Sequence, residues 1–236
     1  MLKLENVVTP SPQQWEAVVR GMRNPMNSWD KSDSYTTHIE DPETFETADY
    51  QFFLGEADAA LMGKLADAGS DHAKFRRMIP VYVDIVAPLY WWKEFDTYKV
   101  GTVANSCSTM HKIHAKEFEL DDFSHDHLVP DGIEILEKSI EILNDTRDSF
   151  LNFDKYFLAD ELVDEITCKE DVWWQMIQLL PSSYNQRRTV MLNYEVLANI
   201  YHARRNHKLT EWHTFCGWIE KLPYSEIIII GEKKNV

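Results

Sequence analysis

The sequence predicts a protein of mixed α and β structure. Isoleucine and valine at positions 79, 81, 83 and 85 alternate with Tyr82 and Asp84, which is the period-two pattern of a half-buried strand. Two other segments, 15–22 and 133–150, repeat their apolar residues every three or four positions. That spacing is typical of helices that bury one face. Helices and strands therefore alternate along one chain.

The N-terminal third is expected to hold a strand, a helix, a loop and a second helix. Residues 1–8 favour a short strand. Ser11 fits a helix N-cap, with Pro12 at the first helical position and Gln14 completing a capping box. Residues 24–48 are polar and predict a long loop. Helical spacing returns over 53–68, and Gly69 is the expected terminator.

The stretch 78–114 is the centre of the prediction. Pro80 lacks an amide donor, so it should lie at the start of the strand or on an edge. After the strand, Trp91, Trp92 and Phe95 form an apolar block that is expected to be core. The run 98–114 is then rich in hydrogen-bonding side chains and enters another helix. A polar run beside a packed scaffold is where a site is expected.

The C-terminal half reads as mainly helical. A long helix is expected from Pro130 to Phe150, packed in a bundle or against a second subunit. The stripe Leu192, Val196 and Ile200 predicts another helix, and 212–219 a further one that Pro223 ends. Four isoleucines at 227–230 predict a terminal strand that docks on another surface.

Composition narrows the function classes. The 236 residues are 44% hydrophobic and 12% aromatic, which suffices for the core of one domain. A net charge of −15 argues against nucleic-acid binding but leaves small anionic ligands open. The three cysteines lack paired spacing and are expected to be free thiols in a reducing compartment. Without a signal peptide or a stretch of about 18 apolar residues, we expect a cytoplasmic protein with no membrane span.

Three groups of residues could carry chemistry. The first is Lys99, Asn105, Ser108 and His111, with His72 upstream; the second is Arg187 and Arg188 with Thr189 and Asn193; the third is Arg204, Arg205, His207 and Lys208. Paired arginines beside amide and hydroxyl groups suit an anion pocket, because guanidinium forks bind phosphate or carboxylate at two points. The open alternative is that these arginines pair with surface carboxylates.

The sequence also contains cysteine and histidine side chains that could form a metal site. Cys107, His111 and His114 stand at helical spacing, and His125 and His127 follow. Thiolate and imidazole at such spacing can bind zinc. The sequence has neither an HExxH motif nor paired CxxC motifs, so no metal ligand is assigned.

The order of these features resembles the flavin-dependent thymidylate synthase (ThyX) family. The family signature RHRxxSxNxxSxRY, laid on YKVGTVANSCSTMH at 98–111, coincides at Asn105 and Ser108. His72 falls at the family's flavin-contacting histidine. The LLP at 179–181 and Thr189, Asn193, Leu197 and Arg204 track the C-terminal block. The resemblance covers roughly 10–115 and 175–220, and 115–175 corresponds to a helical, family-variable region.

Several signature positions differ. The RHR triplet is Tyr98-Lys99-Val100, and the closing Arg-Tyr is Met110-His111. The arginine that follows the late asparagine of the family is Glu195. In the family these arginines hold the nucleotide phosphate and the flavin. Lys99, Arg187, Arg188 and Arg205 are the cations available to replace them.

The resemblance implies a single α+β domain over 1–236, with a central, largely antiparallel sheet flanked by helices and a helical insertion. It also implies a homotetramer with sites at subunit junctions. The implied reaction is methylation of the nucleotide dUMP with methylenetetrahydrofolate and reduced FAD, and NADPH regenerates the flavin. Such a site mainly positions its ligands and donates hydrogen bonds to developing charge.

The resemblance assigns roles residue by residue. Catalytic and loop-shaping roles fall to Asn105, Ser108 and His111; cofactor contacts to His72, Tyr98, Lys99, Asn193 and Arg204; and substrate contacts to Ser106, Arg187, Arg188 and Arg205. Three alternatives stay open. They are an enzyme that hydroxymethylates a pyrimidine nucleotide, a non-catalytic descendant that binds a nucleotide or a protein, and a metal-dependent hydrolase using His111, His114, His125 and His127.

Overall fold

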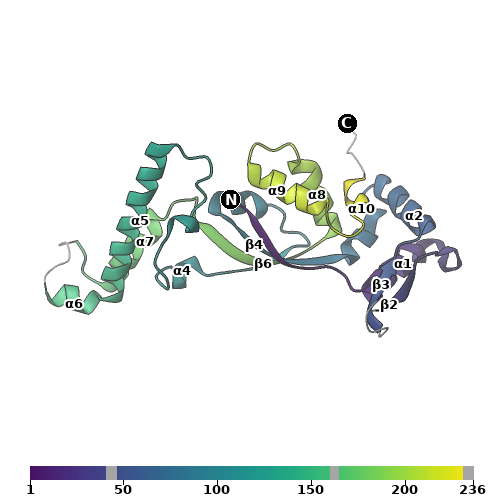
Figure 1. The fold of residues 1–236 in the computed structure, drawn as a ribbon, viewed down its shortest axis with the longest axis horizontal. Coiled ribbons are helices and arrows are strands. Elements are labelled where there is room, and N and C mark those ends of the chain that lie inside the picture. The colour runs from purple at the N-terminus through teal and green to yellow at the C-terminus, as the bar shows by residue number, and fades with distance from the viewer. Residues whose placement is uncertain (41–46, 160–164, 231–236) are drawn as a thin grey trace. The chain divides into compact units, whose positions relative to one another are not determined.

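The computed structural model describes residues 1–40, 47–159 and 165–230 (Figure 1). The chain divides into two compact units. Unit 1 comprises Met1–Lys3, Ile85–Thr97 and Asn105–Arg188, and unit 2 comprises Leu4–Asp84, Tyr98–Ala104 and Thr189–Val236. Each unit is described by itself.

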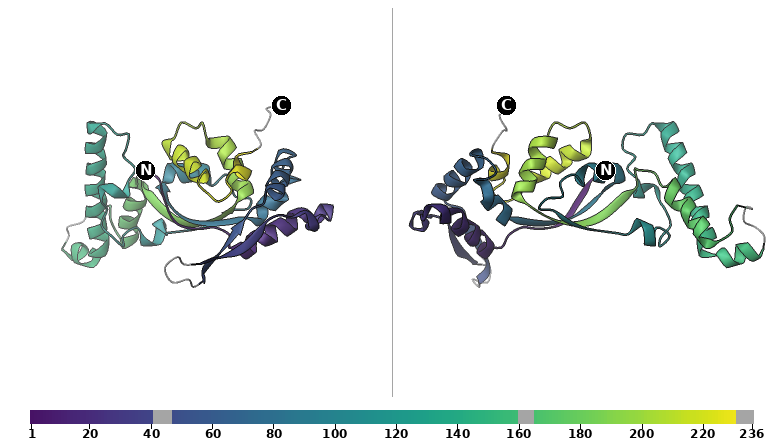
Figure 2. Two further views of the ribbon diagram at one scale, coloured as in Figure 1. Left: turned by 45° about the vertical axis from the view of Figure 1, so that its right-hand side comes forward. Right: turned by 180° about the vertical axis from the view of Figure 1, so that it is seen from behind.

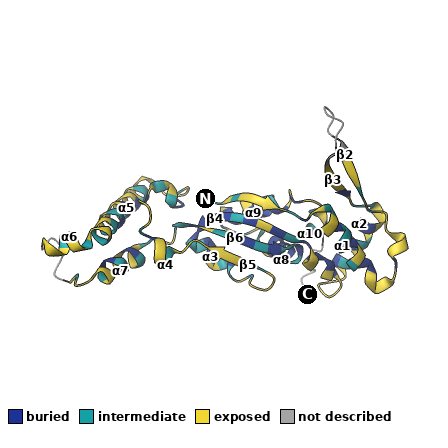
Figure 3. Ribbon diagram, turned by 90° about the horizontal axis from the view of Figure 1, so that it is seen from below, coloured by how far each residue is buried: buried dark blue, intermediate teal, exposed yellow. Residues whose placement is uncertain are grey.

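The main sheet has four strands in the order β1-β4-β6-β5. They are β1 (Lys3–Val8), β4 (Pro80–Pro88), β6 (Asn185–Asn193) and β5 (Val103–Ser106). The sheet is antiparallel and helices flank it, which confirms the predicted α+β class. The alternation in β4 is confirmed too, since Val81, Val83 and Ile85 are fully buried. Figure 3 colours the ribbon by the burial of each residue. Pro80 is the first residue of the strand, as expected.

In unit 2, helix α1 (Pro12–Arg23) begins as predicted. The Ser11 hydroxyl accepts a bond from the Gln14 amide at 3.3 Å, and the Gln14 side chain accepts one from the Ser11 amide at 2.8 Å. The helix buries the apolar face that its spacing predicted. Trp15 on that face stacks on Phe52, with ring centres 5.9 Å apart.

The predicted loop over 24–48 is wrong in part. Two short 3-10 helices, η1 (Asn24–Met26) and η2 (Trp29–Lys31), precede a hairpin of β2 (Tyr35–Glu40) and β3 (Thr47–Phe53). Tyr35 pairs with Phe53 across the antiparallel strands, and their rings stack at 5.3 Å. Cross-strand aromatic contacts of this kind stabilise hairpins. The remainder of the segment, 41–46, lies outside the described residues.

A buried ion pair joins α1 to α2 (Glu56–Asp67). The Arg23 Nε donates to Asp58 Oδ1 at 2.5 Å, and both side chains are almost fully buried. The other oxygen, Oδ2, accepts from the hydroxyls of Ser32 and Ser34, each at 2.7 Å. Burial acts to raise the pKa of Asp58, but these hydrogen bonds outweigh it and hold the pKa below its ordinary value.

The end of unit 2 corrects two predictions. Leu192 belongs to β6, and α8 (Tyr194–Arg204) begins only after that strand. The isoleucine tail forms a short helix, α10 (Glu226–Ile229), in which Ile227 and Ile228 are buried. The predicted terminal strand is therefore wrong. The other elements are η3 (Ala73–Met78) and α9 (Thr210–Ile219), the latter as predicted.

Unit 1 holds the remaining helices. They are α3 (Leu89–Phe95), α4 (Thr109–Lys112), η4 (Leu120–Asp122), α5 (Pro130–Leu151), α6 (Phe153–Leu158) and α7 (Lys169–Leu179). The helix expected from Pro130 is confirmed in α5, and Trp91, Trp92 and Phe95 are buried as predicted. Helices α5 and α7 lie side by side (Figure 2), where Leu143 and Met176 belong to one buried cluster.

Two further features concern the described residues. None of their helices combines the length and the apolarity needed to cross a bilayer. The three cysteines are free thiols: Cys107 and Cys168 are exposed, and Cys216 is buried.

Candidate functional site

Unit 2 contains a pocket of about 500 Å³. Small-molecule sites commonly have volumes in this range. Three chain segments line it: the stretch from the turn after α2 through η3, the loop that precedes β5, and Asn193 with the first turns of α8. The lining residues are Ser70, Arg77, Val100, Gly101, Asn193, Glu195, Val196 and Asn199.

The loop approaches α8 very closely at Gly101. A β-carbon at this position would lie 3.1 Å from the Asn193 side-chain nitrogen and 3.1 Å from a methyl group of Val196. Gly101 also has a φ of +83°, in the region that glycine adopts most readily. Asn193 in turn caps α8, because its side-chain oxygen accepts from the Val196 amide at 3.1 Å. The shape of this wall thus depends on a glycine and an N-cap.

Charge at the pocket comes from an arginine and a carboxylate. Arg77 is exposed and lines the pocket. Glu195 lies 3.8 Å from the guanidinium of the neighbouring Arg76, which also donates to the Ile230 carbonyl at 3.0 Å. Burial lowers the pKa of Arg76, and Glu195 partly offsets this effect. The Glu195 Oε2 atom is buried and receives no hydrogen bond from the described residues.

Tyr98 and Arg204 form a second cluster in unit 2. The Arg204 Nε donates to the Tyr98 hydroxyl at 3.0 Å, and the guanidinium lies 5.0 Å from the ring centre of Trp212. The resemblance gave both residues cofactor roles, and the structure brings them together. Lys99 and Arg205 are exposed.

His72 is also exposed, at the residue before η3 and two positions after Ser70 of the pocket. It does not itself line the pocket described above.

The signature residues of unit 1 occupy exposed positions where β5 ends. Asn105 and Ser106 are the last residues of that strand. The backbone then bonds to β6, since the Cys107 amide donates to the Arg187 carbonyl at 3.0 Å. Ser108 caps α4 by accepting from the His111 amide at 3.0 Å. Ser108 therefore shapes this loop.

The two neighbouring arginines differ in environment. Arg188 bonds to Asp96 at 2.7 Å and lies 4.1 Å from the ring centre of Trp92. Its Nε also donates to the Gln186 side chain at 2.9 Å. Two of its five N–H donors thus bond to side chains within unit 1. Arg187 has an exposed side chain.

The predicted site residues consequently fall into two groups. Those in unit 2 are His72, Tyr98, Lys99, Asn193, Arg204 and Arg205; those in unit 1 are Asn105, Ser106, Ser108, His111, Arg187 and Arg188. Sequence reasoning missed Ser70, Arg77 and Asn199. A signal existed for Asn199, because it stands four positions after Glu195 and so shares its helix face.

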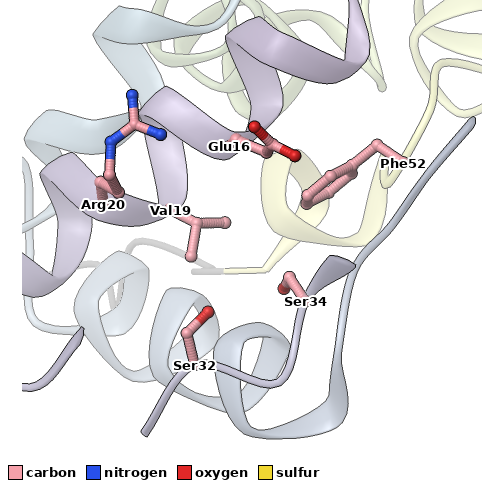
Figure 4. Close-up of a pocket in the computed structure, with 6 residues that line it drawn as sticks. All are labelled: Glu16, Val19, Arg20, Ser32, Ser34 and Phe52. Carbon is pink, nitrogen blue, oxygen red and sulfur yellow. The ribbon is translucent and has the colours of Figure 1, made fainter. Parts of the chain in front are cut away.

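A smaller pocket of about 200 Å³ lies beside α1 (Figure 4). Ser32 and Ser34 line it, but their hydroxyls donate to Asp58. The guanidinium of Arg20 points away from both serines (Figure 4). The polar groups of this pocket therefore do not converge on one point.

Within residues 1–40, 47–159 and 165–230, no three histidine, cysteine, aspartate or glutamate side chains gather in a way that could hold a metal ion.

Known structures share this fold. The chain aligns with two crystal structures of thymidylate synthase X (ThyX) from Helicobacter pylori, both with FAD and dUMP. The TM-score is 0.59 for each, at 13% and 14% sequence identity. The alignments cover 97% of this chain and 96% or 97% of the other. No family model and no curated protein matches the sequence.

Proposed function

We propose that the chain is a flavin-dependent thymidylate synthase-like enzyme, which methylates dUMP with methylenetetrahydrofolate and reduced FAD that NADPH regenerates. One observation carries the proposal. Three segments that resemble the ThyX family line one pocket, represented by Ser70, Gly101 and Asn193. Likeness to ThyX structures over nearly the whole chain supports it further.

The pocket residues fit the ring system of a flavin. The ring offers one N–H donor between two carbonyl acceptors. The buried Glu195 Oε2, which receives no hydrogen bond within the described residues although the Arg76 guanidinium lies 3.8 Å away, suits that N–H. The amides of Asn193 and Asn199 suit the carbonyls, and Arg77 suits negative charge. When bound, a reduced flavin supplies the hydride for the reaction.

The nucleotide would be held by the remaining predicted residues. Lys99, Arg187 and Arg205 have exposed side chains and suit the phosphate. Asn105, Ser106, Ser108 and His111 offer hydrogen bonds to the pyrimidine. From the resemblance to the ThyX family we further propose a homotetramer with its sites at the subunit junctions.

The decisive experiment is a visible absorbance spectrum of the purified protein with FAD, before and after dUMP is added. We expect a bound-flavin spectrum that dUMP perturbs. Asn199→Leu should weaken flavin binding about tenfold, the worth of one buried hydrogen bond of roughly 1.4 kcal/mol. Asn206→Leu, an exposed asparagine beyond α8, is the control. Absence of flavin binding at micromolar concentrations would overturn the proposal.

A second candidate is a descendant that binds the nucleotide without methylating it. Two observations favour it: Glu195 stands where the family has an arginine, and Arg188 is engaged by Asp96 and Trp92. This candidate predicts a flavin spectrum perturbed by dUMP but no dTMP product in a complete assay. Formation of dTMP would exclude it.

A further inference from the structure

Unit 1 contains a pocket of about 370 Å³ that shares no lining residue with the proposed flavin pocket. It lies among α4, the end of α5 and the start of α7. Its apolar walls are Met110, Phe150 and Trp173, and its polar lining is His111, His114, Lys169 and Glu170. Only His111 was assigned to the proposed reaction.

Contacts within unit 1 hold these walls in place. The Trp173 indole nitrogen donates to the Met110 carbonyl at 2.8 Å, which ties α7 to α4. The rings of His114 and Phe150 are 4.6 Å apart. Arg147 of α5 donates to the His114 carbonyl at 3.0 Å. The pocket is therefore formed before any ligand binds, which lowers the entropic cost of binding.

The polar atoms of the pocket are incompletely satisfied. The His114 Nδ1 atom is buried and has no hydrogen-bond partner among the described residues. Buried polar atoms nearly always have a partner, so a ligand group at this nitrogen would complete the environment. Lys169 holds its ammonium 4.5 Å from the centre of the Phe150 ring, above an aromatic wall.

The surrounding charge is positive although the chain has a net charge of −15. The pKa of His114 is lowered by burial and by the cations of Lys112, Lys169 and Arg147. Three cations therefore act on one point of the pocket, opposed in its lining by the carboxylate of Glu170. Such a local excess favours an anion.

We propose that this pocket binds a small aromatic anion, a flat ring that carries an acidic group. The ring lies against Phe150 and Trp173, and the acidic group lies beside Lys169. A ring hydroxyl or amino substituent satisfies His114. The pocket shares His111 with the residues proposed for dUMP, and its other lining residues are additional to the proposed flavin and dUMP sites.

Calorimetric titration of the full chain tests the proposal with two probes of equal shape, β-naphthoate and its neutral amide β-naphthamide. We expect the anion to bind at least tenfold more tightly than the amide. Lys169→Met should remove that preference, whereas Trp173→Leu should weaken both probes. Equal affinity for the two probes, or binding of neither, overturns the proposal.

A matched control comes from α6. Lys155 also holds its ammonium over an aromatic ring, 5.0 Å from the centre of Tyr156, but it does not line the pocket. Lys155→Met should therefore leave both affinities unchanged. Should Lys169→Met fail to fold, as judged by thermal unfolding, Lys169→Gln provides a second variant that must also remove the preference for β-naphthoate.

Competition separates this site from the proposed function. β-Naphthoate should bind equally well in the presence of saturating FAD and dUMP. If it displaces either one, the pocket is part of the nucleotide site and the inference of an additional site falls. If the protein binds neither FAD nor dUMP but still prefers the anionic probe, only the proposed function fails.

Discussion

Arg76 and Glu195 form an ion pair of 3.8 Å at the pocket of unit 2, which Glu195 lines, with only 7% and 12% of their side chains exposed. The ThyX-like sequence pattern has an arginine where this chain has Glu195. The structure shows that the carboxylate has a cationic partner within the same unit. The Glu195 side chain is therefore part of the packing of unit 2.

Breaking this pair should destabilise unit 2. Glu195→Gln removes the paired carboxylate of a buried guanidinium, and we expect a loss of roughly 2 kcal/mol in the free energy of unfolding. Urea unfolding measures the change. The doubly swapped variant, Arg76→Glu with Glu195→Arg, should recover part of the loss. If the double variant loses as much stability as the single variants Arg76→Glu and Glu195→Arg together, the two charges do not interact.

Acid should weaken the protein through Asp58. Its pKa is lower in the folded chain than the ordinary 3.8, so the unfolded chain takes up the proton first. The stabilisation is thus complete above about pH 3.8 and is lost as the pH falls further toward the folded pKa. Asp58→Asn should cost about 3–5 kcal/mol at neutral pH and flatten this dependence.

An exposed aspartate provides the comparison for Asp58. Asp30 of η2 lies on the surface, and Asp30→Asn should change the free energy of unfolding by less than about 0.5 kcal/mol. Urea unfolding over a pH series measures both variants. An Asp58→Asn curve parallel to that of the unmodified chain below pH 4 would count against the role of this carboxylate.

The adjacent arginines of β6 should respond differently to alanine. Arg188→Ala removes the Asp96 ion pair and the contact with Trp92, at about 1–2 kcal/mol of stability. Arg187→Ala removes an exposed side chain and should cost less stability than Arg188→Ala. Under the proposed function it is Arg187→Ala that weakens dUMP binding. Thermal unfolding and dUMP titration together separate the two effects.

Gly101 should not tolerate a side chain. Alanine at a φ of +83° costs about 1–2 kcal/mol, and its β-carbon would crowd Asn193 and Val196. Flavin affinity should fall with stability because this wall lines the pocket. Gly217 in α9 has open space around it, and Gly217→Ala should stabilise the chain by roughly 0.5–1 kcal/mol. Equal effects at both glycines would refute the close-packing argument.

Thiol reactivity should divide the three cysteines. Burial raises the pKa of Cys216 to about 11, with a smaller contribution from Glu220. Its thiolate is therefore scarce at neutral pH. Exposed Cys107 and Cys168 should react with a disulfide reagent in the native protein, and Cys216 only after unfolding. Peptide mapping after labelling identifies the modified residues; native labelling of Cys216 would contradict the prediction.

Sequence patterns predicted correctly those elements that depend only on neighbouring residues in the chain. The cap at Ser11 and the alternation from Ile79 to Ile85 required no knowledge of tertiary partners. The stripe of Leu192, Val196 and Ile200 misled because β6 passes directly into α8. Leu192 is buried by alternation with Val190, and Val196 by the helix that follows. The alternation of a strand, followed directly by the spacing of a helix, looks like one continuous helical stripe.

Tertiary packing decided the other errors. Isoleucine favours strands, yet Ile227 and Ile228 are buried in a helix of one turn. The β2–β3 hairpin depends on pairs such as Tyr35 with Phe53, which cannot be read from either strand alone. Of the pocket residues, Asn193 was predicted because it matches the C-terminal block of the ThyX family. Ser70 and Arg77 belong to the site only because the chain folds back there.

The carboxylate of Asp58 fastens a distant stretch of chain, since its partners Ser34 and Ser32 are 24 and 26 residues away. Closing such a loop is usually associated with a disulfide, which removes conformational entropy from the unfolded chain. A hydrogen-bonded carboxylate constrains only the folded state and needs no oxidant to form. Reductants should therefore leave this closure intact, whereas protonation of the Asp58 carboxylate weakens it.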